Sequence, residues 1–155
     1  MSGMEIARLP VGDPVAGALL AAALADLAER YGGAGDETPM DGAQFDPPAG
    51  AFLVAWLGGV PAGCGGWRTL AADPDVAEIK RMYTRPDQRG HGVASAVLRA
   101  LEESARAAGR KRMALETGYR QPEAIALYQQ LGYEIIPNYG HYADHPLCVS
   151  FGLAL

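Results

Sequence analysis

The residues best suited to bind a ligand lie in the run Gln88-Arg89-Gly90-His91-Gly92, between a strand-like segment and a helix-like one. Glycine permits backbone geometry that a side chain would obstruct, so several unpaired N–H groups can converge at the positive end of the helix. Converging amides of this kind bind phosphate and other anions. The sequence therefore predicts an anion-binding site at residues 88–94, called here the glycine loop. An ordinary strand-turn-helix connection that needs two glycines is the alternative, and spacing alone does not choose between them.

The flanking segments must hold the glycine loop in place. Residues 78–84 are expected to form a strand. After the loop, apolar residues recur at helical spacing on one face while charged residues fall on the other, and Gly109 supplies a stop. The apolar positions are Val93, Ala94, Val97, Leu98, Leu101, Ala105 and Ala108. Sheet and helix together would fix where a bound phosphate lies.

The rest of the chain predicts a mixed α/β sheet in one layered domain over residues 1–155. Gly58-Gly59 is a two-residue hairpin signal, and glycines at 63, 65 and 66 indicate a bulge or a close backbone approach. Asp13 is a plausible N-cap ahead of Pro14. Helices are expected at 15–31 and 122–131 besides the one after the glycine loop, and strands at 4–9, 51–57, 60–70, 76–84, 111–117, 133–136 and 147–153. The stretch 72–75 is expected to be a turn.

Composition limits the classes of partner and compartment. A net charge of -5 argues against nucleic acid or an anionic membrane as the main partner. Positive charges are expected to gather around the glycine loop instead, or to form a solvated basic face: Lys80, Arg81, Arg85, Arg89 and Arg99. We expect no secretory signal, no membrane span and a cytoplasmic protein, in which Cys64 and Cys148 are reduced thiols.

Two motifs in order give a family resemblance. The glycine loop resembles the acetyl-CoA pyrophosphate loop of the GNAT superfamily of N-acetyltransferases, whose pattern is Q/R-x-x-G-x-G/A. Residues 123–133, EAIALYQQLGY, resemble the second signature, A-x-x-L-Y-x-x-x-G-F/Y. The resemblance implies a mixed, mostly antiparallel central sheet of six to seven strands flanked by about four helices.

The resemblance also implies acetyl-CoA as co-substrate, with its pyrophosphate on the amides of the glycine loop and its pantetheine arm on the strand before it. The cofactor-binding residues expected on this basis are Met82, Tyr83, Thr84, Gln88, Arg89, Gly90, His91, Gly92, Val93, Ala94, Gln121 and Tyr128. Many relatives carry Asn where Gln121 and Pro122 stand, so a pantetheine contact there is lost or reshaped.

Three side chains are candidates for the chemistry of acyl transfer. An alkylamine has a pKa of about 10, so a group must accept its proton before it attacks a thioester. Glu78, at the start of a strand, is the first candidate for this base and Glu116 the second; each could instead be a structural carboxylate paired with Arg81, Arg112 or Lys80. Tyr128, by resemblance, donates a proton to the departing sulfur, although its spacing with Ala124 and Leu131 would also suit the core.

The segment 137–146, rich in aromatic and polar residues, is expected to shape the acceptor site. His141, Asp144 and His145 do not make a convincing metal site because a third well-placed ligand is missing, and we expect no metal. Arg81 and Arg120 could hold a carboxylate if the acceptor is an amino acid.

These features lead to one main hypothesis: an N-acetyltransferase that moves acetyl from acetyl-CoA to a primary amine of a small molecule, amino acid or peptide by direct attack, with a homodimer as one option for assembly. A CoA-binding sensor or protein-interaction module that lost turnover is the alternative from another class. A nucleotide-phosphate binder is a third, disfavoured because a P-loop Lys-Ser/Thr is absent.

Overall fold

One seven-stranded sheet organises the computed structural model, which describes residues 3–33, 35–36, 38 and 40–155. The strands lie in the order β1-β2-β3-β4-β5-β7-β6, and every neighbouring pair is antiparallel except β4 with β5. Their bounds are β1 Met4–Arg8, β2 Gly50–Leu57, β3 Val60–Leu70, β4 Asp73–Thr84, β5 Arg112–Gly118, β6 Glu134–Ile136 and β7 Cys148–Ala154. The expected mixed, mostly antiparallel sheet is confirmed.

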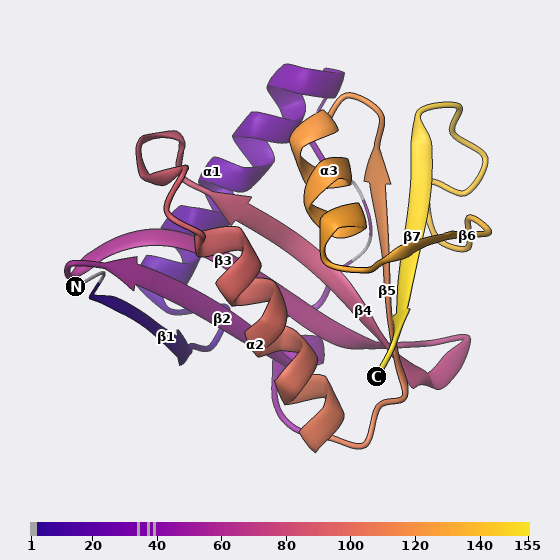
Figure 1. Cartoon of the computed structure of the whole chain (residues 1–155), viewed down its shortest axis with the longest axis horizontal. Coiled ribbons are helices and arrows are strands. Elements are labelled where there is room, and N and C mark those ends of the chain that lie inside the picture. Colours follow the sequence, from indigo (N-terminus) through magenta and orange to yellow (C-terminus); the bar gives the residue numbers. More distant parts are fainter. Residues whose placement is uncertain (1–2, 34, 37, 39) are drawn as a thin grey trace.

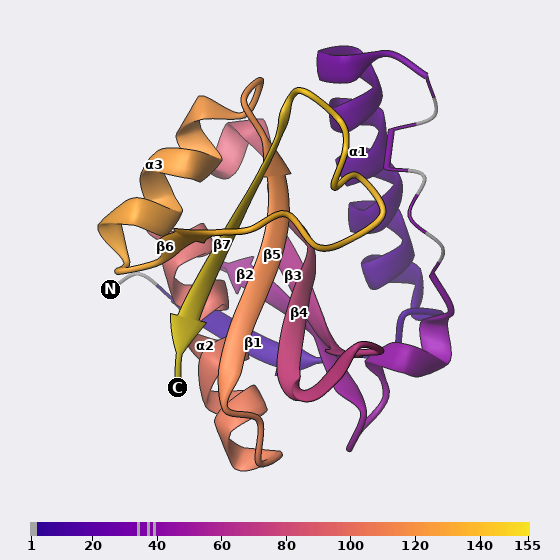
Figure 2. The same ribbon diagram turned by 90° about the vertical axis from the view of Figure 1, so that its right-hand side faces the viewer.

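Helices cover both faces of this sheet (Figures 1 and 2). Helix α1 (Pro14–Tyr31) lies on one face, and α2 (Val93–Ala107) and α3 (Pro122–Gln130) lie on the other. Two 3-10 helices, η1 (Gly42–Phe45) and η2 (Pro86–Gln88), complete the helical elements of the described residues, where about four helices were expected. The Asp13 carboxylate accepts from the Val15 amide at 2.8 Å and so caps α1 as predicted.

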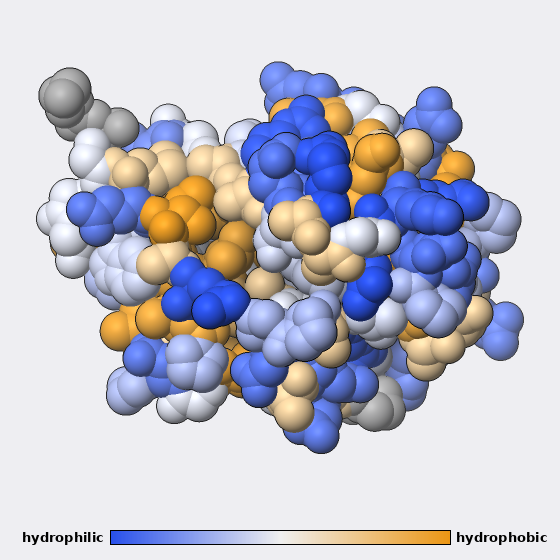
Figure 3. Space-filling model, turned by 90° about the horizontal axis from the view of Figure 1, so that it is seen from below, coloured by the Kyte–Doolittle hydropathy of each residue, from blue (hydrophilic) through white to orange (hydrophobic). Residues whose placement is uncertain are grey.

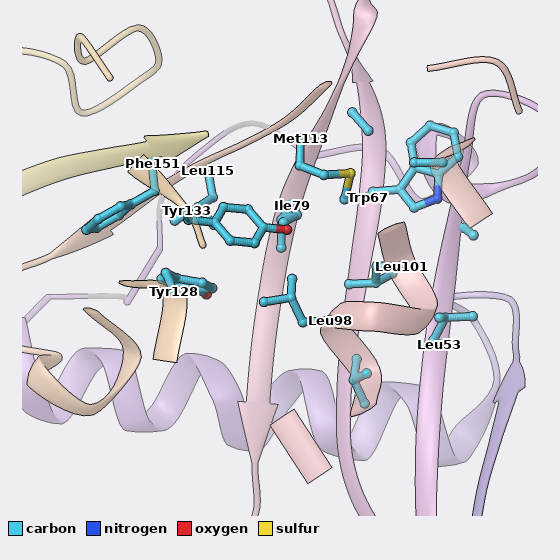
Figure 4. Close-up of a cluster of buried hydrophobic side chains, with 14 of the residues drawn as sticks. Leu53, Trp67, Ile79, Leu98, Leu101, Met113, Leu115, Tyr128, Tyr133 and Phe151 are labelled. Atoms are coloured by element: carbon cyan, nitrogen blue, oxygen red, sulfur yellow. The ribbon is translucent and has the colours of Figure 1, made fainter. Parts of the chain in front are cut away.

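Each face of the sheet has its own apolar core. Helices α2 and α3 bury the larger one, to which Trp67, Leu98, Leu101 and Phe151 contribute (Figure 4). Helix α1 buries the smaller one, around Phe52. Figure 3 shows one surface of the molecule, on which hydrophilic residues predominate in the centre and on the right and apolar residues gather mainly on the left. Within the described residues, no helix is long and apolar enough to cross a membrane.

The glycines of β3 let α2 lie close to the sheet. A Cβ at Gly65 would lie 2.4 Å from the Met82 sulfur and 3.2 Å from Leu101, and a Cβ at Gly63 would lie 2.8 Å from Val93. The ladder between β3 and β4 also shifts register here. The sequence predicted a bulge or a close backbone approach at these glycines, and the structure shows both.

Strand β4 parts from β5 halfway along its length. The parallel pairing covers only Val76 to Glu78 of β4, although β4 continues to Thr84 and β5 continues along β7 (Figure 1). The hydrogen-bonding edge of β4 after Glu78 is therefore open on the β5 side, and a slot separates the two strands. This divergence positions the candidate site.

Two sequence expectations need correction at the turn before β4. The turn was expected at 72–75, but Leu70 already pairs with Asp73, so the connection is confined to Ala71 and Ala72. Strand β4 accordingly begins at Asp73 and not at Val76. Only Asp73 of this stretch pairs with β3, because Thr69 pairs with Ala77 and residues 74–76 lie in a register shift of the ladder.

Candidate active site

The glycine loop presents free amides at the start of α2. Gly90 and Gly92 have φ of 84° and 77°, and no heavy atom lies within 4 Å of where a Cβ would stand on either. The Ala96 amide is the first to donate into the helix, to the Gly92 carbonyl at 3.0 Å. For the amides from Gly90 to Ser95, no described residue supplies an acceptor. An anion can therefore approach six amides without displacing protein groups.

The cations that were predicted to gather around this loop are mostly neutralised by ion pairs. Four of the five are paired with carboxylates: Lys80 and Arg81 with Asp36, Arg85 with Asp87, and Arg99 with Glu102. Arg89 is the exception among them, because its Nε donates only to the Thr84 carbonyl, at 3.4 Å. Neutralisation of the others leaves Arg89 and the backbone amides as the electrostatic basis of the anion site.

The slot between β4 and β5 connects the two faces of the sheet. Its lining includes Ile79 and Tyr128 from the α3 side and Lys80 and Asp36 from the α1 side. Met82 and Tyr83 line it with the open edge of β4. A ligand lying along this edge would have side chains from both faces within reach.

Tyr128 combines a packed ring with an unengaged hydroxyl. Its ring centroid lies 5.8 Å from that of Tyr133 and 6.0 Å from that of Phe151 (Figure 4). Burial raises the pKa of the phenol, so the group keeps its proton at neutral pH. No described residue accepts a hydrogen bond from this hydroxyl, and the residue lines the slot. Tyr128 therefore belongs to the core through its ring and has a proton donor available for a ligand.

Glu78 is fully engaged by protein groups. Arg68 donates from Nε to Oε1 at 2.9 Å, and the Tyr139 hydroxyl donates to Oε2 at 3.0 Å. The residue is only 3% exposed. The alternative of a structural ion pair holds for Glu78, but its partner is Arg68 and not Arg81, Arg112 or Lys80, because the β3–β4 register places Arg68 opposite Glu78.

Glu116 differs from Glu78 in having one unengaged oxygen. Its Oε2 accepts from the Gly140 amide at 3.2 Å and from the Cys148 thiol at 3.5 Å. Its Oε1 is buried without a hydrogen-bond partner. None of Arg81, Arg112 and Lys80 pairs with Glu116. The alternative that Glu116 is a structural carboxylate held by one of these cations is therefore wrong.

The loop between β6 and β7 contacts both Glu78 and Glu116. Glu78 lies opposite Ala114 in the parallel register, and Glu116 is two residues further along β5, so both project from the same face. Tyr139 contacts Glu78 and the next residue, Gly140, contacts Glu116. A Cβ on Gly140 would overlap the Glu116 carboxylate, so a larger residue there would displace this carboxylate.

A cavity of about 130 Å³ adjoins the slot and shares Asp36 and Glu116 with it. Its walls come from the end of α1, the end of β5 and the β6–β7 loop. Gln121 also lines both spaces, where its Nε2 donates to the Tyr31 hydroxyl at 3.3 Å. Among the described residues, no group of three potential ligands could hold a metal ion.

Sequence reasoning missed three residues of this region. Asp36, which pairs with Lys80 and Arg81, stands in a glycine-rich stretch whose local pattern gives no sign of a long-range ion pair. Arg68 and Tyr31 were likewise read only as parts of a strand and a helix. Pairing across strands was the one signal that could have placed Arg68, once the hairpin register was known.

The central strands of the sheet diverge beside free amides at a helix start. The chain belongs to the acetyltransferase (GNAT) family, whose model matches residues 20–133. This membership confirms the resemblance drawn from the two motifs.

Relatives and solved structures agree with this assignment. The chain is 39% identical over 98 residues to "IAA acetyltransferase" of Azospirillum brasilense and 39% identical over 93 residues to "Uncharacterized N-acetyltransferase YjgM" of Escherichia coli K12. The matches cover 62% and 59% of this chain and only 62% and 56% of those proteins, so the chain spans about three fifths of their length. A solved "putative acyl-CoA N-acyltransferase" from Klebsiella pneumoniae is 31% identical with a TM-score of 0.82, covering 98% of this chain and 97% of its own. An acetyltransferase from Streptococcus agalactiae shares the fold at 21% identity and TM-score 0.71, with full coverage of both chains (100% each).

Proposed function

We propose that this protein is a cytoplasmic N-acetyltransferase that moves the acetyl group of acetyl-CoA to a primary amine. The observation that carries the proposal is the slot between β4 and β5. It has free amides at the adjacent helix start, and its lining includes an unengaged hydroxyl and one unengaged carboxylate oxygen. Family membership and relatives named acetyltransferases support acetyl as the transferred group.

The residues present fit the donor. Gly90 and Gly92 leave open space in which a diphosphate can meet the amides of the glycine loop, and Arg89 adds a charge without a carboxylate partner. The open edge of β4 from Met82 to Thr84 can pair with amide groups of the pantetheine arm, as an added strand would. Acetyl-CoA supplies an acetyl group activated as a thioester.

Glu116 is the better base in this mechanism. Both Glu78 oxygens are already engaged, whereas Glu116 Oε1 can accept a proton from an incoming ammonium. The amine then forms the new C–N bond while the C–S bond breaks, and Tyr128 gives a proton to sulfur. The nitrogen loses a second proton, which restores Tyr128, and Glu116 passes its proton to solvent.

The cysteines do not favour a covalent acyl-enzyme. Burial raises the pKa of Cys64 to about 12, and burial together with Glu116 raises that of Cys148 to about 11. Both are therefore thiols and poor nucleophiles at neutral pH. Direct attack by the amine is the route that these groups support.

Two measurements on the same protein test the proposal. Calorimetry with acetyl-CoA reports donor binding, and a thiol-release assay over a panel of primary amines reports transfer. We expect saturable donor binding and CoA release that depends on the amine. Tight binding without amine-dependent release would identify a CoA-binding sensor instead, and absence of binding would remove the donor site.

A further inference from the structure

Buried side-chain atoms without hydrogen-bond partners cluster in the slot. Such atoms are rare in folded proteins and each calls for an explanation. Among the described residues there are four, and three of them belong to two residues that line the slot: Arg81 Nε, Arg81 Nη1 and Glu116 Oε1. The slot thus combines unsatisfied donors of a cation with an unsatisfied acceptor of an anion.

A backbone irregularity places Arg81 there. Arg81 has a φ of 61°, and β4 carries one extra residue relative to β3 at this point. In a regular strand two consecutive side chains point to opposite faces, but here Lys80 and Arg81 both reach Asp36, at 3.0 and 2.8 Å. The Arg81 side chain is 5% exposed, and its contact with Asp36 is an ion pair without an aligned hydrogen bond at Nη1. Lys80, by contrast, also donates to the Thr38 hydroxyl.

Glu116 likewise has no described lysine or arginine partner beside it in the adjoining cavity. The adjoining cavity is lined by Asp36 and Glu116 but, within the described part of the chain, by no lysine or arginine. Asp36 is neutralised by Lys80 and Arg81, which leaves Glu116 as a carboxylate without a cation. A carboxylate oxygen removed from water without a donor is costly, and a ligand ammonium would supply one.

The second arginine that could have held a carboxylate is committed elsewhere. Arg120 donates from Nη1 to the Arg30 carbonyl at 3.1 Å and lies over the Tyr31 ring at 5.9 Å. It lines neither the slot nor the cavity. Lys80 and Arg81 share the single carboxylate of Asp36, so one positive charge is left over. Arg81 is the arginine that lines the slot and can present this charge to a carboxylate-bearing acceptor.

We propose that the acceptor is a free amino acid, whose carboxylate is bound by Arg81, whose ammonium is bound by Glu116, and whose apolar or aromatic side chain occupies the adjoining cavity. This inference rests on the proposed acetyl transfer. Leu27, Tyr31 and Leu147 give the cavity apolar walls, and its volume of about 130 Å³ suits one side chain. A simple amine would satisfy Glu116 alone, and the N-terminus of a peptide would bring no carboxylate to Arg81.

Matched acceptors test this directly on the wild-type protein. Alanine, leucine and phenylalanine are each compared with their amide and with the amine that remains after loss of the carboxylate, using CoA release with acetyl-CoA as donor. Within the best series we expect the amino acid to exceed both analogues in kcat/KM by roughly 10- to 100-fold, the range for hydrogen bonds to a charged group. Equal or faster turnover of the decarboxylated amines would overturn the inference and leave acetyl transfer standing.

Arg81→Gly separates this role from a structural one. Glycine accepts the positive φ of the position, so the change removes the guanidinium while sparing the backbone. We expect the preference for the amino acid over its amine to fall to within about 3-fold with unchanged acetyl-CoA affinity, whereas Lys111→Ala, at an exposed cation, keeps the preference. Arg81→Lys, which retains the charge, provides a second variant and should retain part of the preference. A preference that survives in Arg81→Gly would overturn the proposal.

Binding keeps the inference testable without turnover. If no amine releases CoA, the proposed acetyl transfer fails, and calorimetry with the same amino acids on CoA-loaded protein decides the inference separately. Amino-acid binding that is lost in Arg81→Gly would sustain it. Absence of amino-acid binding would refute it.

Discussion

Tyr128 and Tyr133 are neighbouring core residues that differ in whether their hydroxyl has a hydrogen-bond acceptor. The rings of Tyr128 and Tyr133 pack together, yet the Tyr133 hydroxyl donates to buried Glu102 at 2.8 Å and the Tyr128 hydroxyl has no described acceptor. Tyr128→Phe keeps the ring and removes only the proposed acid. We expect kcat to fall by about 100-fold with acetyl-CoA affinity nearly unchanged, measured by thiol release and calorimetry.

Tyr133→Phe is the matched control for this prediction. It removes a hydroxyl that satisfies a carboxylate buried to 4% exposure, so we expect a loss of about 1–3 kcal/mol in the free energy of unfolding and little change in kcat. Equal kcat in wild-type protein and Tyr128→Phe would assign Tyr128 to packing alone.

The two sheet carboxylates give a second contrast between residues. Glu78→Gln breaks the buried pair with Arg68, and we expect a loss of about 3 kcal/mol in unfolding free energy, measured by urea titration, with modest change in turnover per folded molecule. Glu116→Gln should instead lower kcat/KM by about 100-fold, with a smaller effect on stability. A stable but inactive Glu78→Gln protein would identify Glu78, and not Glu116, as the base.

At the scale of elements, the start of α2 carries the donor site. Gly92→Glu places bulk and negative charge among the free amides, and we expect acetyl-CoA binding to be lost in calorimetry. Gly109→Glu is the matched control, because Gly109 has a φ of 84° at the other end of the same helix and open space around its Cβ position. Both variants should lose about 1 kcal/mol of stability from the strained backbone. Unchanged affinity in Gly92→Glu would place the donor elsewhere.

Most elements were predictable because their signals are local. Apolar spacing in α2, the Gly58-Gly59 hairpin and the Asp13 cap each depend on residues a few positions apart, and the structure confirms all three. The glycine loop was also found from a local pattern, and its role in donor binding stays a prediction. The turn was predicted too late at Asp73-Pro74-Asp75, because Asp73 already pairs with Leu70 and the residues after it lie in a register shift of the strand.

The arrangement of the slot was not predictable from local pattern. Alternation along β4 would separate Lys80 and Arg81, and only the extra residue in that strand brings both to Asp36. Arg68 and Tyr139 reach Glu78 from separations of 10 and 61 residues. Contacts of this kind depend on the assembled sheet, so the motif identified the family while the structure was needed to distinguish Glu116 from Glu78.

At the scale of the whole molecule, one ion-pair group ties the segment after α1 to the sheet. Asp36 reaches β4 through Lys80 and Arg81, and its Oδ1 also accepts from the Thr38 amide at 2.9 Å. These side chains are at most 12% exposed, in contrast to the surface pair of Arg85 and Asp87, whose exposures are 39% and 58%. The buried group should therefore contribute to global stability far more than the surface pair.

Acid should weaken the fold through Asp36 in a defined window of pH. Burial alone would raise its pKa, but Lys80, the Thr38 hydrogen bonds and Arg81 outweigh this effect and lower the pKa from its ordinary value of 3.8 to about 2. Because the folded pKa lies below the unfolded one, the stabilisation is complete above about pH 5 and is lost as pH falls toward 2. The shift corresponds to about 2 kcal/mol.

Asp36→Asn should therefore lower the free energy of unfolding at pH 7 by at least about 2 kcal/mol, measured by urea titration, and its stability should depend less on pH below pH 5. Asp87→Asn is the control and should change the free energy of unfolding by less than about 1 kcal/mol. A wild-type acid limb retained in Asp36→Asn would show that other carboxylates govern acid unfolding.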